Sequence, residues 1–230
     1  MRKGVVFDLD DTIYFEIDYV RSGFKEISRF IAQTGIYNSK EIYRFLLNSF
    51  RQGIRGKNFD LMLQNFPLIR KYFCIEELVN IYRSHIPKIK ILYEAGVVIR
   101  NLRKKGYLLG IITDGYLISQ KNKVYSLSIS EYFDAIIYTD EYGKQYWKPN
   151  EFAFQLMSDK LGLPHSKLCY VADNPQKDFL APNKLKWLTI RFKHPKQLHY
   201  SEEADSPIKK PNLILSNLLD LETILENRGD

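Results

Sequence analysis

Residues 3–14 read KGVVFDLDDTIY, and this stretch decides how the rest of the chain is interpreted. Its short apolar run, VVF, is rich in β-branched and aromatic residues, which predicts a buried strand. Three carboxylates, Asp8, Asp10 and Asp11, follow at once. Open α/β sheets bind ligands beyond the carboxyl ends of their strands, and Mg²⁺ prefers carboxylate oxygens. The stretch alone fits either such a site or an Asp-rich turn. A calcium-binding EF-hand loop fits poorly, because its Gly and its bidentate Glu are missing from the expected positions.

The composition is that of a globular protein. The chain has 230 residues, of which 45% are hydrophobic and 27% charged. This length suits one large domain or one domain with an insertion, and it allows about 70% of the unfolded surface to be buried. The two cysteines, Cys74 and Cys169, are far apart and lack metal-ligand spacing. We therefore expect them to be reduced core residues of a cytoplasmic protein.

Charge and hydropathy limit the partners. Only three apolar residues separate the N-terminal Met-Arg-Lys-Gly from Asp8, so no signal peptide is expected. No apolar run approaches the ~20 residues that a membrane helix needs, so no membrane partner is expected. The net charge of +7 suits an anionic partner. Because the basic residues are scattered and no nucleic-acid motif occurs, a small phosphorylated substrate or a plain solvated surface is favoured over nucleic acid.

Two kinds of organisation follow one another along the chain. Between residues 15 and 88, apolar residues recur at helical spacing, and four helices without a strand between them predict a small helical module. From Val97 onward, helices and strands alternate, which predicts a parallel sheet with right-handed crossovers. Residues 193–212 are polar and contain three prolines, which indicates a mobile surface loop. The predicted strands are Tyr107–Ile112, Phe133–Tyr138, Leu168–Ala172, Trp187–Arg191 and Leu213–Leu215.

Polar residues follow three of the buried strands. They are Asp8 with Asp10 after the first of these strands, Thr113 after the second, and Asp173 with Asp178 after the third. Lys148 lies on a loop between the second and the third of these strands. The carboxyl ends of parallel strands share one edge, so these groups can converge. Each also has a plainer interpretation, because Thr113 can cap a helix, Lys148 can be solvated and Asp178 can be a helix N-terminal charge.

Taken together and in this order, the motifs resemble those of the haloacid dehalogenase superfamily. VVFDLDDT resembles its first motif, IITDG the second, the lysine of KP (Lys148) the third, and VADNPQKD the fourth. The chain departs from many members in having Ala172 where they have glycine. The resemblance implies an α/β fold, a Rossmann-like parallel sheet with helices on both faces and an inserted all-helical cap. Residues 1–14 and 89–230 would form the catalytic core and residues 15–88 the cap.

The resemblance also implies roles for the residues. A carboxylate can attack a phosphoryl group and divide hydrolysis into two easier steps. Asp8 would be this nucleophile, and Mg²⁺ would be held by Asp8, the backbone carbonyl of Asp10 and Asp173. The phosphoryl oxygens would be held by Lys148 and Thr113. The residues expected to contact the substrate are Leu9, Asp114, Gly115 and Tyr14, and the supporting residues are Asn174 and Asp178.

Asp10 is the residue that discriminates between reactions. It could protonate a leaving alkoxide and then deprotonate water, and family members that cleave carbon–halogen bonds generally lack an acid there. We therefore expect Mg²⁺-dependent hydrolysis of a small phosphomonoester, such as a sugar phosphate or a nucleotide, through an aspartyl-phosphate. A phosphomutase and a non-catalytic phospho-ligand binding module are the alternatives, although binding alone requires no nucleophile.

Overall fold

The computed structural model describes residues 3–227, and the chain divides into two compact units. One unit combines Met1–Ile17 with Lys90–Asp230, and the other is Asp18–Ile89. The helical unit thus begins three residues later and ends one residue later than the predicted segment, 15–88. That this unit acts as a cap stays a prediction.

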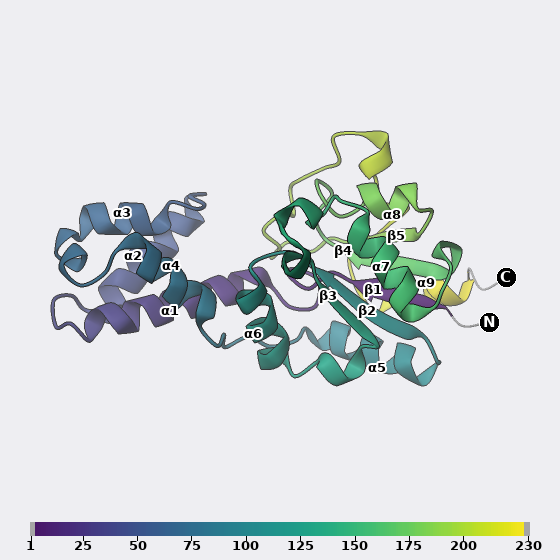
Figure 1. The fold of residues 1–230 in the computed structure, drawn as a ribbon, viewed down its shortest axis with the longest axis horizontal. Coiled ribbons are helices and arrows are strands. Elements are labelled where there is room, and N and C mark those ends of the chain that lie inside the picture. Colours follow the sequence, from purple (N-terminus) through teal and green to yellow (C-terminus); the bar gives the residue numbers. More distant parts are fainter. Residues whose placement is uncertain (1–2, 228–230) are drawn as a thin grey trace. The chain divides into compact units, whose positions relative to one another are not determined.

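A parallel six-stranded sheet forms the centre of the first unit (Figure 1). The strand order is β3-β2-β1-β4-β5-β6, which is the crossover topology that alternating helices and strands predict. The predicted α/β class with a Rossmann-like sheet is confirmed. The strands are β1 (Gly4–Phe7), β2 (Leu108–Thr113), β3 (Ala135–Tyr138), β4 (Leu168–Ala172), β5 (Leu188–Phe192) and β6 (Leu213–Leu215).

Strand β1 lies inside the sheet, between β2 and β4, and all four of its residues are buried. Such a position suits these residues because they are apolar or small. Val6 pairs with Gly110 of β2 on one side and with Tyr170 of β4 on the other. The carboxyl ends of β2, β1 and β4 are therefore neighbours, and these are the strands that lead into the second, first and fourth motifs.

Helices cover the sheet on both faces (Figure 1). One face carries α7 (Phe152–Leu161) and α8 (Leu180–Lys184), and the other carries α5 (Tyr93–Lys104) with α9 (Asp220–Asn227). Phe154 of α7 belongs to one buried cluster with the strand residues Val6 and Tyr170. A Cβ at Gly110 would lie 2.6 Å from the Met157 sulfur, so a larger residue there would force the Met157 side chain to shift. The remaining helix, α6 (Leu117–Leu127), follows β2 and contacts β3.

The second unit is helical and its core is aromatic. Phe24 makes edge-on or tilted ring contacts with Phe50, Phe59 and Tyr82 at 5.9–6.4 Å between centroids. Such pairs stabilise a packed core beyond the area they bury. Its helices are α1 (Glu16–Ala32, which begins in the first unit), α2 (Ser39–Arg51), α3 (Asn58–Asn65) and α4 (Ile75–Ser84), with a 3₁₀ turn at Pro67–Lys71.

One expectation about the cysteines is wrong. Cys169 is a buried free cysteine on β4, as predicted, but Cys74 is exposed. Cys74 occupies the N-cap of α4, where its backbone N–H donates to the Glu77 carboxylate at 2.8 Å. A helix start needs its N–H groups satisfied, and this position lies at the surface. Among the helices of residues 3–227, none has the length and apolar character needed to cross a membrane.

Candidate active site

Three of the predicted site residues lie at the carboxyl ends of adjacent strands. Asp8 follows β1, Asp173 follows β4, and Thr113 is the last residue of β2. All three side chains are buried, with at most 3% of each residue exposed. The order β2-β1-β4 places Asp8 between the other two, at the edge of the sheet where α/β proteins bind ligands.

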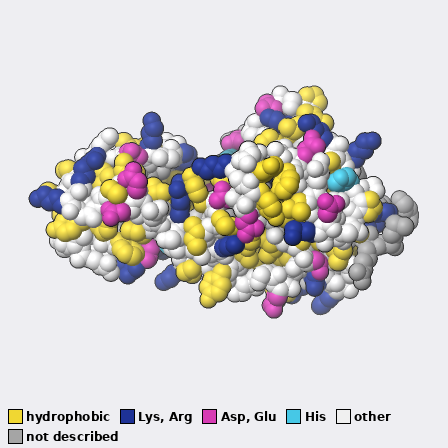
Figure 2. Space-filling view, viewed as in Figure 1, with side chains coloured by type: hydrophobic (Ala, Val, Ile, Leu, Met, Phe, Trp, Pro, Cys, Tyr) yellow, Lys and Arg dark blue, Asp and Glu magenta, His cyan; other side chains and the backbone are white. Residues whose placement is uncertain are grey.

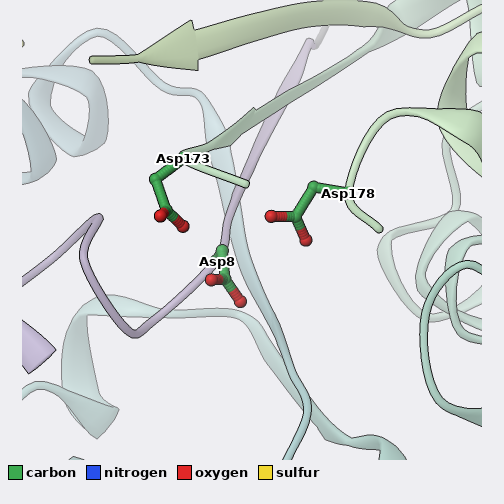
Figure 3. A group of neighbouring side chains, drawn as sticks. All are labelled: Asp8, Asp173 and Asp178. Carbon is green, nitrogen blue, oxygen red and sulfur yellow. The ribbon is translucent and has the colours of Figure 1, made fainter. Parts of the chain in front are cut away.

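Asp8, Asp173 and Asp178 form a buried acidic cluster (Figure 3). One carboxylate oxygen from each lies within 4.8 Å of those of the other two. Burial raises the pKa of Asp8 to about 6 although the Lys148 ammonium acts to lower it. Burial and then the charges of Asp178 and Asp8 raise the pKa of Asp173 well above its ordinary value. Three such groups are costly to bury together without a compensating cation.

Lys148 supplies part of that compensation. Its side chain is fully buried, and its Nζ lies 2.7 Å from Oδ1 of Asp8 and 2.7 Å from Oδ1 of Asp178. Nζ also donates to the hydroxyl of Tyr170 at 3.0 Å. An ammonium has three N–H groups, so each N–H group of Lys148 has one oxygen partner.

Asp10 lies in a different environment from Asp8. Lys123 of α6 donates to both of its carboxylate oxygens, at 2.7 and 3.0 Å, and Gln120 donates to Oδ2 at 2.8 Å. The Tyr14 hydroxyl donates to Oδ1. Burial acts to raise the pKa of Asp10, but the charge of Lys123 and the hydrogen bonds from Lys123, Tyr14 and Gln120 together outweigh burial, so the pKa is lowered. Gln120 also donates to the hydroxyl of Thr113, so it joins the first and second motifs.

The residues after β2 position the third motif. The Asp114 carboxylate accepts from the backbone N–H of Lys148 at 3.2 Å and from the Thr139 hydroxyl at 2.8 Å. Gly115 follows with a φ of +124°, a conformation that favours glycine. Asp114 therefore holds the backbone of Lys148 in place through this hydrogen bond.

Asp11 fixes the first-motif loop. It has a φ of +53°, which is unusual for a residue other than glycine. Its carboxylate accepts from the backbone N–H groups of Glu16 and Leu198, each at 2.7 Å, while Gln197 donates to its backbone oxygen at 2.7 Å. The polar segment predicted to be a mobile surface loop thus contributes hydrogen bonds to the site.

The remaining predicted residues occupy structural positions around the site. Leu9 is fully buried and its carbonyl accepts from the Ile13 N–H at 3.0 Å. The Asn174 side chain accepts from the Gln176 N–H at 2.9 Å, and the Asn174 N–H donates to Asp178 at 3.0 Å. Tyr14 is fully buried, with its hydroxyl directed at Asp10.

The acidic cluster fits a divalent cation. Within residues 3–227, Oδ2 of Asp173 is buried without a hydrogen-bond partner. A buried carboxylate oxygen left unpaired is expensive unless a cation binds it. Asp8 and Asp173 offer the hard oxygen ligands that Mg²⁺ prefers. The donor set is thus compatible with the predicted metal.

Comparison with known proteins agrees with this geometry. Residues 5–191 match the family model described as haloacid dehalogenase-like hydrolase. The chain belongs to this family. A glyceraldehyde 3-phosphate phosphatase of Methanocaldococcus jannaschii is 28% identical over 229 residues, which cover 95% of this chain and 99% of the relative.

Solved structures share the fold of this haloacid dehalogenase-like hydrolase. One is a phosphatase of the same superfamily from Thermococcus onnurineus, with 21% identity, a TM-score of 0.63 and 97% coverage of each chain. Another is a 2-haloacid dehalogenase from Pseudomonas syringae, with 18% identity and a TM-score of 0.65, covering 99% of this chain and 100% of that one. Fold alone therefore does not separate phosphatases from dehalogenases.

Sequence reasoning missed several residues at the site of this hydrolase. Gln120 and Lys123 stand one turn apart on α6, and both are buried despite being polar. Tyr170 lies on a buried strand, so its position in the sequence indicates a core residue, but its hydroxyl accepts a hydrogen bond from Lys148. Lys177 lies inside the fourth motif, immediately before Asp178. The i, i+3 spacing of Gln120 and Lys123 after the second motif was the available signal.

Proposed function

We propose that this protein is a Mg²⁺-dependent phosphatase that hydrolyses a small phosphomonoester through an aspartyl-phosphate. The observation that supports it best is the pair of carboxylates in separate environments, Asp8 in the acidic cluster and Asp10 beside Lys123. Phosphoester hydrolysis through a covalent intermediate requires a nucleophile and an acid–base group, and these two aspartates offer both. The Asp10 side chain also favours this reaction over carbon–halogen cleavage.

In the first step, a carboxylate oxygen of Asp8 attacks phosphorus. The bond from phosphorus to the ester oxygen breaks, and that oxygen takes a proton from Asp10. Although Lys123 favours the ionised form of Asp10 in the free protein, the charge of an incoming phosphate acts in the opposite direction. In the second step, Asp10 removes a proton from water as the water oxygen attacks the phosphorus of the aspartyl-phosphate, and the bond from phosphorus to the Asp8 oxygen breaks. Inorganic phosphate leaves and the Asp8 carboxylate is restored.

Other residues orient these groups. Asp8, Asp173 and the backbone carbonyl of Asp10 would hold Mg²⁺. The chemistry that Mg²⁺ supplies when bound is positive charge, which offsets repulsion between the nucleophile and the phosphate. Lys148 fixes Asp8 relative to Asp178, and Thr113 offers a hydroxyl to the phosphoryl oxygens.

Glyceraldehyde 3-phosphate is the first substrate to test, because it is the compound named for the relative from Methanocaldococcus jannaschii. The experiment measures phosphate release from a panel of esters with purified protein and Mg²⁺. Glycerol 3-phosphate is the matched compound, since it differs only in carrying a primary alcohol in place of the aldehyde. The ester p-nitrophenyl phosphate reports general phosphatase activity. Asp8→Asn protein is the control for a contaminating phosphatase.

The panel also tests the alternatives. Release of free phosphate by the wild type and not by Asp8→Asn supports the proposal. An isomeric phosphate ester without free phosphate would identify a phosphomutase. Ligand binding without any product would identify a binding module.

A further inference from the structure

Lys148 cannot offer the incoming phosphate an N–H group without giving up a contact. Asp8, Asp178 and Tyr170 place three oxygens within 3.0 Å of its Nζ, and the side chain is fully buried. A substrate phosphate is a dianion that must be brought beside the Asp8 carboxylate. Binding it there calls for a cation that is not already engaged by three partners.

Lys177 is such a cation in the same site. It belongs to the turn after β4 that also carries Asp173 and Asp178, and 34% of its side chain is exposed. Its Nζ lies 3.9 Å from Oδ2 of Asp114, which is beyond hydrogen-bond distance. Within residues 3–227, this is the one ion pair of Lys177.

The charges around Lys177 favour the protonated, positively charged form of its side chain. Burial and the charge of Lys148 act to lower its pKa, but Asp178, Asp8 and Asp114 outweigh them and raise it. Its charge in turn acts to lower the pKa of Asp8 and of Asp173. The Lys177 ammonium is therefore protonated at neutral pH, and its charge acts on both carboxylates.

We propose that Lys177 binds the phosphate group of the substrate as a second lysine beside the nucleophile. This inference rests on the proposed phosphatase function and adds a residue to it. Because Lys177 is partly exposed and loosely paired, it can contact an arriving phosphate without leaving a buried partner unsatisfied. The competing explanation is that Lys177 only offsets the charge of the acidic cluster.

The first test measures the binding of inorganic phosphate by calorimetry in the presence of Mg²⁺. The variants are Lys177→Met and Lys177→Arg, and the control is Lys184→Met, which removes a surface lysine paired with Glu151 at 3.3 Å. Loss of one charged hydrogen bond predicts about 10- to 100-fold weaker phosphate binding in Lys177→Met. We expect Lys177→Arg to recover part of this loss and Lys184→Met to match the wild type.

Kinetics with p-nitrophenyl phosphate separate binding from charge compensation. If Lys177 holds the phosphate, Lys177→Met should raise KM by a similar factor with a smaller effect on kcat. If it only offsets the acidic cluster, the melting temperature should fall while phosphate affinity and KM match those of Lys184→Met. That second result would overturn the inference.

A measurement on the wild-type protein does not depend on how the variants fold. Acetylation of lysines, followed by mass spectrometry, should show that phosphate protects Lys177 and leaves the exposed Lys184 reactive. Equal labelling of Lys177 with and without phosphate would contradict the proposal. Phosphate binding that depends on Lys177 in a protein without turnover would uphold this inference while overturning the proposed phosphatase function.

Discussion

Lys123 Nζ lies 2.7 Å from Oδ1 of Asp10, so a buried lysine of α6 pairs with the second aspartate of the first motif. The two residues are 113 positions apart in the chain. With Gln120 on the same helix and Tyr14 on the first-motif loop, Lys123 leaves the Asp10 carboxylate little freedom to rotate. Acid–base catalysis depends on such fixed geometry.

Replacing Lys123 should impair proton transfer more than binding. In Lys123→Met we expect kcat to fall by up to about 100-fold for an alkyl phosphate, whose leaving oxygen needs a proton. The loss should be smaller for p-nitrophenyl phosphate, because p-nitrophenolate leaves without one. Steady-state kinetics on both esters checks this. The matched control is Lys121→Met, an exposed residue of α6 paired with Glu141 at 2.9 Å. Equal losses on the two esters would refute the positioning role.

Tyr14 should affect turnover through Asp10. Tyr14→Phe keeps the buried ring and removes the hydroxyl that donates to Asp10. We expect kcat to fall by about tenfold with KM unchanged, because one hydrogen bond that orients the acid–base group is lost. Steady-state kinetics with the best ester of the panel measures both constants. A rise in KM alone would instead favour the predicted direct contact between Tyr14 and the substrate.

Asp8→Asn should abolish phosphatase activity without unfolding the protein. The amide preserves the size of the side chain and an oxygen that can accept from Lys148, but it is a poor nucleophile. Burial already disfavours the Asp8 charge and raises its pKa to about 6. We therefore expect the melting temperature without metal to be equal to or above that of the wild type. Phosphate release and thermal melts measure the two effects, and wild-type turnover would rule out Asp8 as the nucleophile.

Chelation should remove activity, and Mg²⁺ should restore it. Three buried carboxylates within 4.8 Å repel one another, so Mg²⁺ should also raise the melting temperature. Binding to the native state alone adds about 2.7 kcal/mol when free Mg²⁺ is 100 times its Kd. Ca²⁺ should not restore activity, because its longer bonds and larger ligand number would displace Asp8. Asp173→Asn should weaken the Mg²⁺ effect, and full activity in excess chelator would exclude a metal-assisted mechanism.

Arg191 should be important for stability. Its buried guanidinium donates to the backbone oxygens of Asp173 and His199, at 2.9 and 3.0 Å. Arg191→Met would leave both oxygens unsatisfied, which should lower the free energy of unfolding by about 2–4 kcal/mol in urea melts. The control, Arg103→Met, breaks a partly exposed ion pair with Asp134 and should cost at most about 1 kcal/mol. Similar losses in the two variants would contradict this account.

The sequence by itself determined the class of fold and the edge of the sheet where the site lies. Apolar runs that end in Asp8, Thr113 and Asp173 predicted parallel strands whose carboxyl ends meet, and β2, β1 and β4 are adjacent. This succeeded because hydrophobic periodicity and the handedness of crossovers are local rules that act along the chain. The exposed Cys74 was missed because residue type predicts burial only on average.

Only the tertiary structure decided which side chains meet. Lys123 reads as a solvated helix residue and Tyr170 as strand core, yet one pairs with Asp10 and the other with Lys148. The segment around Gln197 reads as a loose surface loop, yet it donates to the backbone of Asp11, 186 positions away. Hydrogen bonds and ion pairs act over a few ångströms in space, whatever the distance along the chain. The partners of each catalytic group therefore depend on how the helices and loops pack around the sheet.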